Sequence, residues 1–200
     1  IALAGSATGL ENGFDDAFSG LSKNSMGVWV QRTSIPYKGF EEGRYPVFKL
    51  NDVDYLKSRV PEIEYIAPGL QAGAFSGSPP LVVRGLKSDN FNVFGNFPVY
   101  AKISVINIFD GGRYINDDDI KYERKVAVIG EGTQERLFNV GEDPIGKYIR
   151  INDVNFMVVG VTKFTEGGGF GSDSDITIPY TTFAKMYNRG DQFGFMFISG

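Results

Sequence analysis

Hydrophobic residues near the start of the chain recur at the spacing of a helix. They are separated by alternating intervals of four and three residues and comprise Leu3, Ala7, Leu10, Phe14, Ala17 and Leu21. This stripe predicts a helix over roughly 2–23. Interspersed glycines weaken it by about 1 kcal/mol each relative to Ala, so we expect it to need support along one face or at one end. It fits either a core helix or a stalk that continues from a membrane helix.

The next segment has the pattern of a β-α-β unit. Apolar residues alternate over 26–34, which predicts a strand. Asn51, with Asp54 three residues later, predicts the start of a helix over 52–60. A short strand at 63–66 completes the unit.

Short strands follow a Gly-, Ser- and Pro-rich connection at 69–80. We expect a strand at 81–86, a turn or a single helical turn at 89–94, and at 99–109 a long apolar segment with room for a bend. Asn116 is the expected N-cap of a further helix, in which Asp119 occupies the third position, where the helix dipole favours negative charge.

Apolar runs further on predict a compact β-rich block. Residues 125–130, KVAVIG, indicate a buried strand, and 131–138 a short helix with its last two residues inward. A hairpin follows at 141–161: the Pro144 turn, a strand that alternates from Lys147, a turn at Asn152-Asp153 and an apolar return strand.

A second Gly-rich connection at 166–175 separates the block from the end of the chain. There a strand at 176–179, a helix at 181–187 and a strand at 193–199 are expected, with Phe193, Phe195 and Phe197 on one strand face. We therefore predict an α+β fold, a split β-α-β domain with an inserted β-rich lobe. The domain segments are 1–75 (with the N-terminal stalk helix), 76–175 (the inserted lobe) and 176–200 (the incomplete second segment).

Composition narrows the possible functions. The 200 residues are 42% hydrophobic, include 17 Phe and 10 Tyr, and carry a net charge of −4, so we expect a folded domain without the basic face that nucleic acid requires. Without Cys, a disulfide scaffold, a thiolate nucleophile and a Cys-ligated zinc are excluded. Without His, Ser-His-Asp triads and most zinc enzymes are excluded as well. The chain has no apolar run near ~20 residues and no secretory signal, so we expect a domain excised from a longer protein.

Motifs with possible chemistry favour structural explanations. The glycines at 167–171 precede acidic residues and a strand, whereas a phosphate loop precedes a helix. Acidic residues at 116–119 and 173–175 lack the spacing of a calcium loop, so capping and solvated turns are expected. Glu41-Glu42 and Glu142-Asp143 lie in polar turns, where we expect ordinary pKa values and not those of catalytic carboxylates. Three phenylalanines are expected in the core, although an exposed binding patch is the alternative: Phe91, Phe94 and Phe97.

Several of these pieces, in this order, resemble the extracytoplasmic domain of MacB-type ABC transporter permeases, which are related to the FtsX-like permeases. The matching residues are Gly112 and Arg113, the VAVIG strand (Val126, Ala127, Val128, Ile129 and Gly130), the DPIGK turn (Asp143, Pro144, Ile145, Gly146 and Lys147) and the VGV of the return strand (Val159, Gly160 and Val161). Residues 80–190 match well and the first 75 more loosely.

The resemblance implies a periplasmic domain of an inner-membrane permease, with a porter-like part and an inserted lobe of the type called Sabre. It implies that ATP hydrolysis on a separate cytoplasmic domain or subunit drives movement of this non-catalytic domain, for efflux or lipoprotein extraction. No cofactor, metal or catalytic residue is expected here. The implied partners are an ABC ATPase, a second permease copy, and a periplasmic adaptor with an outer-membrane duct.

Two alternatives come from other classes. A secreted carbohydrate-active or ligand-binding domain would show a deep pocket with converging carboxylates of raised pKa. A structural surface module would occur in repeated copies along its gene.

Overall fold

The computed structural model describes residues 24–36, 38, 39, 41–44, 46–73, 77–164 and 171–200. The helix predicted over 2–23, and most of the glycine-rich run at 167–171, lie outside the described residues. None of the helices in the described ranges is long and apolar enough to cross a membrane.

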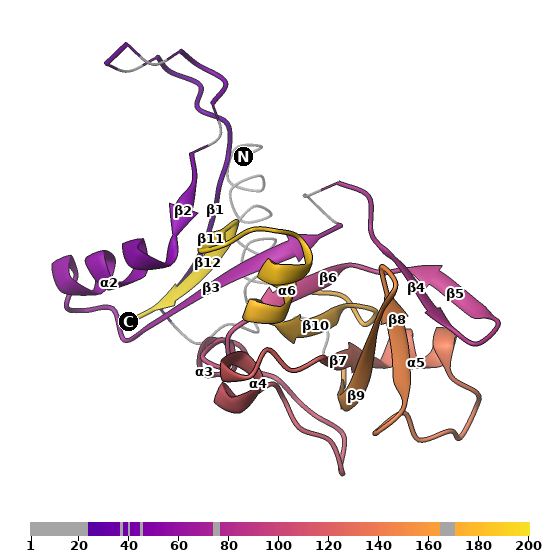
Figure 1. Ribbon diagram of the computed structural model, residues 1–200. Helices are drawn as coiled ribbons and strands as arrows, with labels where there is room; N and C mark the ends of the chain where they lie inside the picture. Colours follow the sequence, from indigo (N-terminus) through magenta and orange to yellow (C-terminus); the bar gives the residue numbers. More distant parts are fainter. Residues whose placement is uncertain (1–23, 37, 40, 45, 74–76, 165–170) are drawn as a thin grey trace, which may run out of the picture.

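A ten-stranded mixed sheet runs through the described part of the chain (Figure 1). Its hydrogen-bonded order is β1-β12-β3-β6-β10-β7-β9-β8-β4-β5. In chain order the strands are β1 (Ser25–Trp29), β3 (Tyr65–Ala72), β4 (Leu81–Arg84), β5 (Lys87–Asn90), β6 (Val93–Asn96), β7 (Val126–Gly130), β8 (Tyr148–Ile151), β9 (Val154–Thr162), β10 (Ile176–Pro179) and β12 (Phe195–Ser199). A separate pair is formed by β2 (Phe48–Lys49) and β11 (Gln192–Phe193).

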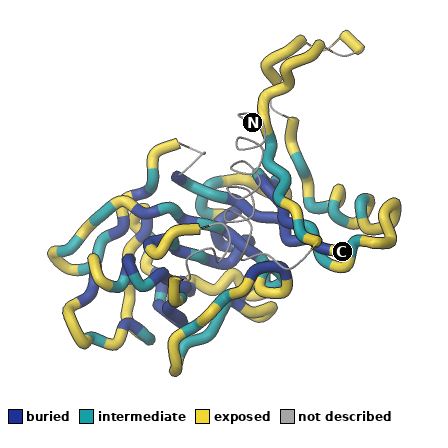
Figure 2. Tube along the Cα trace, turned by 180° about the vertical axis from the view of Figure 1, so that it is seen from behind, coloured by how far each residue is buried: buried dark blue, intermediate teal, exposed yellow. Residues whose placement is uncertain are grey.

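Helices cover both faces of this sheet. On one face Phe183 of α6 (Tyr180–Met186) packs where a side chain at Gly95 would lie, and α5 (Glu131–Leu137) contacts β5, β7 and β9. On the other, α3 (Tyr100–Ile103) packs on β3 and β12. The other helices of the described residues are α2 (Leu50–Arg59), which buries no residue, and α4 (Asp117–Lys121). Figure 2 shows the buried residues concentrated in the sheet, while α2 and the loop before β2 are largely exposed.

The β-rich block follows the sequence pattern closely. All five residues of β7 are buried, as are Leu137 and Phe138. In β8, Ile149 and Ile151 are buried whereas Tyr148 and Arg150 are exposed. The predicted turn at Asn152-Asp153 has φ values of 43° and 65°, the left-handed conformation that a two-residue hairpin turn needs.

The sequence predicts one helix cap correctly and a second one incorrectly. The Asn116 side chain accepts a hydrogen bond from the Asp119 N–H at 3.0 Å, while Asp119 accepts from the Asn116 N–H at 3.0 Å. The cap predicted at Asn51 is wrong, because α2 begins at Leu50 and the Lys49 N–H donates to Asp52 at 2.8 Å. Asp52 therefore has the role predicted for Asp54, two residues earlier.

Three central segments differ from their predictions. Residues 89–94, expected as a turn, contribute to β5 and β6. The segment at 99–109 forms α3 and then a bridge from Ile108 to Thr162, so it is not one extended run. The connection at 69–80 begins later than expected, because β3 continues to Ala72 through pairing with β6. These pairings are long-range, so local composition does not reveal them.

The last expected strand is interrupted at Gly194. Phe193 belongs to β11 and packs against Phe48 with ring centroids 5.3 Å apart. Phe195 and Phe197 lie in β12 and share a different apolar cluster with Ala67. The three rings therefore do not form one face, and the prediction for Phe193 is wrong.

The sheet crosses both predicted domain boundaries. β6, from the segment 76–175, lies between β3 of the first segment and β10 of the second. Two connections are narrow, with two residue pairs each among the described residues. These are β10–β7, where Ile176–Ile129 and Thr177–Val128 are paired, and β4–β8, where Val82–Ile151 and Val83–Arg150 are paired. The division at 75/76 and 175/176 remains a prediction.

Candidate functional site

The residues that carry the family resemblance gather around β9. Its second half pairs in parallel with β7, and at a bulge Val158 pairs with Ala127 while Gly160 pairs with Val128. The Arg113 N–H donates to the Val159 carbonyl at 2.8 Å, so the chain near Gly112 runs alongside the bulge. The Gly146 N–H donates to the Val158 carbonyl, also at 2.8 Å. Three motifs that are distant in sequence are thus joined through one strand.

Glycine is needed in this cluster because backbones approach closely. A Cβ atom on Gly112 would lie 2.9 Å from the Gly160 Cα, and one on Gly160 would collide with the Arg113 carbonyl oxygen. A Cβ on Gly130 would likewise collide with the Asp173 backbone. Gly146 differs, because the space around it is open and its φ of 77° is what requires glycine.

Arg113 anchors a buried carboxylate. Its guanidinium donates to both oxygens of Asp119, at 2.6 and 3.1 Å, and Arg124 donates at 3.4 Å. Burial disfavours the ionised form of Asp119, whose side chain is fully buried, but the bonds from Arg113, the Asn116 N–H and Arg124 prevail and lower its pKa. Asp119 therefore does more than cap a helix, because it ties α4 to the motif at Gly112-Arg113.

The turn before β8 uses its polar groups structurally. Asp143 accepts from the Ile145 N–H at 2.9 Å, and the Lys147 N–H donates to the Pro144 carbonyl at 3.0 Å. Glu142 accepts from the Asn139 N–H and from Arg84, bonds that lower its pKa. The expectation of an ordinary pKa at Glu142 is therefore wrong, and the shift is opposite to what a general acid needs.

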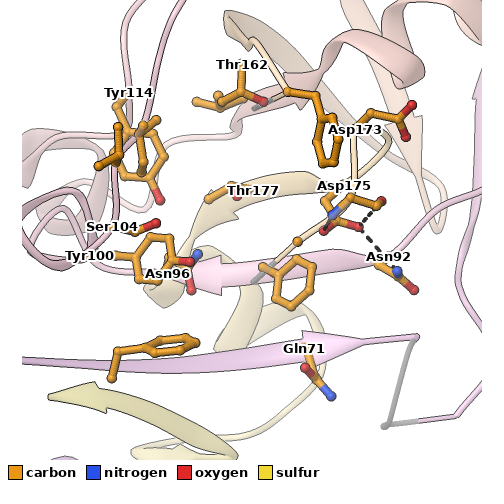
Figure 3. Close-up of a pocket in the computed structure, with 18 of the residues that line it drawn as sticks. Gln71, Asn92, Asn96, Tyr100, Ser104, Tyr114, Thr162, Asp173, Asp175 and Thr177 are labelled. Atoms are coloured by element: carbon orange, nitrogen blue, oxygen red, sulfur yellow. Dashed lines mark hydrogen bonds between the residues drawn. The ribbon is translucent and has the colours of Figure 1, made fainter. Parts of the chain in front are cut away.

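A cavity of about 290 Å³ lies on the face of the sheet that α3 covers. It spans strands from both sides of the β10–β7 connection, with Phe195 and Phe94 on one side and Val128 and Thr162 on the other. Phe94 and Phe195 meet edge to face at 6.2 Å. Figure 3 shows polar side chains converging on this cavity from several elements.

One end of the cavity is lined by uncharged polar side chains. The Tyr114 hydroxyl lies near Asn96 and Thr177, but it makes no hydrogen bond of normal geometry with any described residue (Figure 3). Asn96 and Ser104, which also line the cavity, are 5% and 7% exposed. Burial raises the pKa of Tyr114, so its hydroxyl stays protonated at neutral pH.

The other end carries two aspartates. Asp175 accepts from the Ser172 N–H at 2.6 Å, the Ser172 hydroxyl at 2.9 Å and the Asn92 amide at 3.2 Å (Figure 3). Burial raises the pKa of Asp175 despite these bonds, and the negative charge of Asp173 adds to the effect. Asp173 lies at the rim and accepts from the Ser174 hydroxyl at 2.6 Å.

Of the family-motif residues, Val128 lines this cavity. Of the motifs weighed for chemistry or binding, Phe94, Gly171, Asp173 and Asp175 line it. Phe91 is buried and Phe97 stacks on Tyr180 at 4.5 Å, which confirms core packing. No cluster of His, Cys, Asp and Glu suited to a metal ion occurs in the described ranges. Sequence reasoning missed Asn92, Asn96 and Thr177, and it took Tyr114 only as part of the segment that begins at Gly112-Arg113. The alternation Asn-x-Phe-x-Asn over 92–96 could have indicated a strand with a polar face.

These features define the class of the protein as an α+β domain built on one large mixed sheet. Within it, the motif residues stabilise the fold. A family model described as the MacB-like periplasmic core domain matches residues 1–199. The chain belongs to this family, which makes it a periplasmic domain of a MacB-like membrane protein. The predicted α+β fold and the family resemblance are confirmed.

Relatives of the chain are transport proteins. It is 35% identical over 141 residues to a "Pyoverdine export ATP-binding/permease protein PvdT" from Pseudomonas syringae pv. tomato, covering 68% of this chain and 20% of the relative. It is 27% identical over 186 residues to a "Macrolide export ATP-binding/permease protein MacB" from Bdellovibrio bacteriovorus, covering 91% of this chain and 27% of the relative. The chain thus spans about a fifth to a quarter of the curated relatives it matches.

Solved structures share the fold. The periplasmic region of MacB from Actinobacillus actinomycetemcomitans aligns with a TM-score of 0.69 at 21% identity, covering 90% of this chain and 76% of that one. The extracellular domain of the noncanonic ABC-type transporter YknZ from Gram-positive bacteria aligns with a TM-score of 0.65 at 17% identity, covering 86% and 83%.

Proposed function

We propose that this domain transmits ATP-driven movement of a permease to the periplasm, so that the whole protein exports a substrate. The observation that carries the proposal is the continuous sheet, which extends from β1 at one edge to β5 at the other. The printed names of the relatives, export ATP-binding/permease proteins, support the general role.

The first and last described strands offer a common point of attachment. β1 and β12 pair antiparallel, so that Ser25 lies opposite Ser199. The Gly200 N–H donates to the Asn24 carbonyl at 3.3 Å, and the Glu64 N–H to the Ser199 carbonyl at 2.8 Å. A force applied at either end of the described chain therefore reaches the same corner of the sheet.

Hydrogen bonds outside the strands reinforce the narrow β10–β7 connection. Thr181 and Thr182 of α6 donate to the carbonyls of Ile120 and Arg124, at 2.8 and 3.0 Å. Residues 173–175 accept from the start of α5, through the Gly130 and Gly132 N–H groups at 2.8 Å and the Thr133 hydroxyl at 2.6 Å. These bonds favour joint movement of the two halves of the sheet over hinging between them.

In this proposal the domain has no catalytic role and needs no cofactor. The support is that two carboxylates with lowered pKa are engaged in structural bonds, Asp119 with Arg113 and Glu142 with Arg84, and that Asp175, whose pKa is raised, is held by Ser172 and Asn92. ATP hydrolysis would occur on an ATP-binding domain or subunit, as the names of the relatives suggest. A second permease copy and an adaptor with an outer-membrane duct remain expectations from the resemblance.

The proposal is tested by following the far edge of the sheet during ATP turnover. Leu86, in the β4–β5 turn, is fully exposed, so a spin label on Leu86→Cys should not disturb packing, and the chain has no other cysteine. In the reconstituted full-length permease with its ATPase, the distance between the labels of two copies should change between the ATP-bound and nucleotide-free states. A distance distribution that is identical in both states would overturn the proposal.

A second label pair within one copy is the matched control. Tyr55 on α2 is exposed and lies in the first segment of the chain, so a double variant with Leu86 reports the shape of the domain itself. This internal distance should stay constant while the distance between copies changes.

A further inference from the structure

The cavity beside α3 combines an apolar wall with polar groups deep inside it. Its volume of about 290 Å³ lies at the lower end of the range for small-molecule sites. Phe94 and Phe195 supply aromatic surface, while Asn96, Ser104 and Tyr114 supply polar groups. Such a mixture, with a few polar groups on an apolar wall, is typical of sites that orient a small ligand.

The Tyr114 hydroxyl is the polar group of the cavity that lacks a hydrogen-bond partner. It is buried and makes no hydrogen bond of normal geometry within the described residues, although the Asn96 and Thr177 side chains lie near enough to offset part of the rise in its pKa. A buried hydroxyl without a partner destabilises a fold, because it has lost water and gained nothing in exchange. A ligand with an acceptor atom in the cavity would satisfy it.

Charge around the cavity restricts the ligand further. Asp173 and Asp175 lie at one end, and the Asp175 carboxylate is already engaged by Ser172 and Asn92. Lys163, the cation of the described lining, lies 4.7 Å from the Phe109 ring centroid. Two acidic groups disfavour an anion, and the groups around Tyr114 are uncharged.

We infer that this cavity binds an uncharged amphipathic molecule, with an aromatic or alicyclic body against Phe94 and Phe195 and a carbonyl-type acceptor that takes the Tyr114 hydroxyl hydrogen. The inference goes beyond the proposed transmission of movement and does not depend on it. Because the cavity spans the β10–β7 connection, a bound molecule contacts both halves of the sheet.

The test uses the 200-residue chain and Prodan, an uncharged naphthyl ketone whose fluorescence depends on polarity and on hydrogen bonding to its carbonyl. Titration should give saturable binding with a blue-shifted emission. Naphthoate, an anion with the same ring system, should compete at least tenfold more weakly than the uncharged naphthyl ketone itself. Equal competition by naphthoate would contradict the proposed ligand class.

Three variants locate the binding. Tyr114→Phe removes only the hydroxyl and should weaken Prodan binding about three- to tenfold, without lowering the thermal stability of the free chain. Val105→Trp, at an exposed position on the rim, should fill the mouth of the cavity and abolish binding. Tyr148→Phe, an exposed tyrosine of β8 outside the cavity, is the matched control and should bind as the original chain does.

Two results would overturn the inference. One is the absence of saturable Prodan binding by a chain that melts cooperatively. The other is binding that both Tyr114→Phe and Val105→Trp leave unchanged, because the probe would then occupy another place.

Discussion

The surroundings of β9 and the cavity beside α3 adjoin in one sheet but are built in opposite ways. Around β9 the backbones touch at Gly112 and Gly160, and the buried Asp119 is paired with Arg113 and Arg124. At the cavity, the Tyr114 hydroxyl makes no hydrogen bond of normal geometry with a described residue, and burial raises the pKa of Asp175. Complete pairing and close packing indicate architecture, whereas groups left without a partner indicate a place for something else.

The residues by which the family is recognised are therefore mostly different from the residues that could bind a ligand. The motifs that identify the family lie almost entirely around β9 and the turn before β8, and Val128 is the one that also reaches the cavity. The side chain with unused binding capacity, Tyr114, directly follows the motif residues Gly112 and Arg113 but faces the cavity. A sequence signature can therefore identify a domain through residues that only hold it together.

The largest contrast is expected between two glycines of the motif set. Gly160→Ala should destabilise the domain by about 3 kcal/mol or more, because its Cβ would collide with the Arg113 carbonyl in a tightly packed backbone. Gly146→Ala should cost only about 1–2 kcal/mol, because its φ is unfavourable for Ala but the space around it is open. Urea unfolding of both variants measures the difference, and equal losses would contradict the role assigned to the Gly160 contact.

Arg113 offers the next largest effect. Arg113→Met leaves the fully buried Asp119 with weaker partners and should cost about 2 kcal/mol. Arg150→Met, which removes a pair with Asp153 between exposed side chains at 3.9 Å, should cost less than about 0.5 kcal/mol. If Asp119→Asn in the Arg113→Met background restores no stability, the buried charge is not what Arg113 compensates.

The smallest expected effect is on the pH dependence of stability, to which Asp119 and Asp175 contribute in opposite directions. The pKa of Asp119 is lowered from 3.8, so its contribution to stability is complete above that value and is lost as pH falls through the lowered pKa. The pKa of Asp175 is raised, so its contribution is complete below 3.8 and is lost as pH rises through the raised pKa.

Urea unfolding between acidic and neutral pH should reveal this contrast. The stability difference between the original chain and Asp119→Asn should shrink as pH falls, whereas the difference for Asp175→Asn should grow, by on the order of 1 kcal/mol per unit of pKa shift. Two profiles with the same slope would remove the contrast between the surroundings of β9 and the cavity.

Local patterns in the sequence predicted the β9 region well and the cavity poorly. Alternation in 148–151, the apolar run at 126–130 and the turn at Asn152-Asp153 are all set by neighbours in the chain, so their structure follows from short-range rules. The cavity depends on long-range pairing. The alternation over 92–96 could indicate that Asn92 and Asn96 share a face, but only the insertion of β6 between β3 and β10 places that face beside Phe195 and Thr177.

The same limit explains the errors at Phe193 and at 99–109. Phe193 has the spacing of its neighbours Phe195 and Phe197, yet its pairing with β2 takes it to another cluster. The bridge from Ile108 to Thr162 likewise depends on a partner more than fifty residues away. Periodicity indicates which apolar residues share a strand face, but not which strand or cluster they pack against.

The central claim is that the two halves of the sheet move as one body, and a reversible disulfide across the β10–β7 connection between them tests it most directly. Val128 and Thr177 are paired on antiparallel strands, where cysteines lie within reach of a disulfide. In the full-length permease, export by the Val128→Cys/Thr177→Cys variant should be the same when oxidised and reduced, as in the two single variants. Export that stops on oxidation and returns on reduction would show that the halves must separate, which contradicts the account.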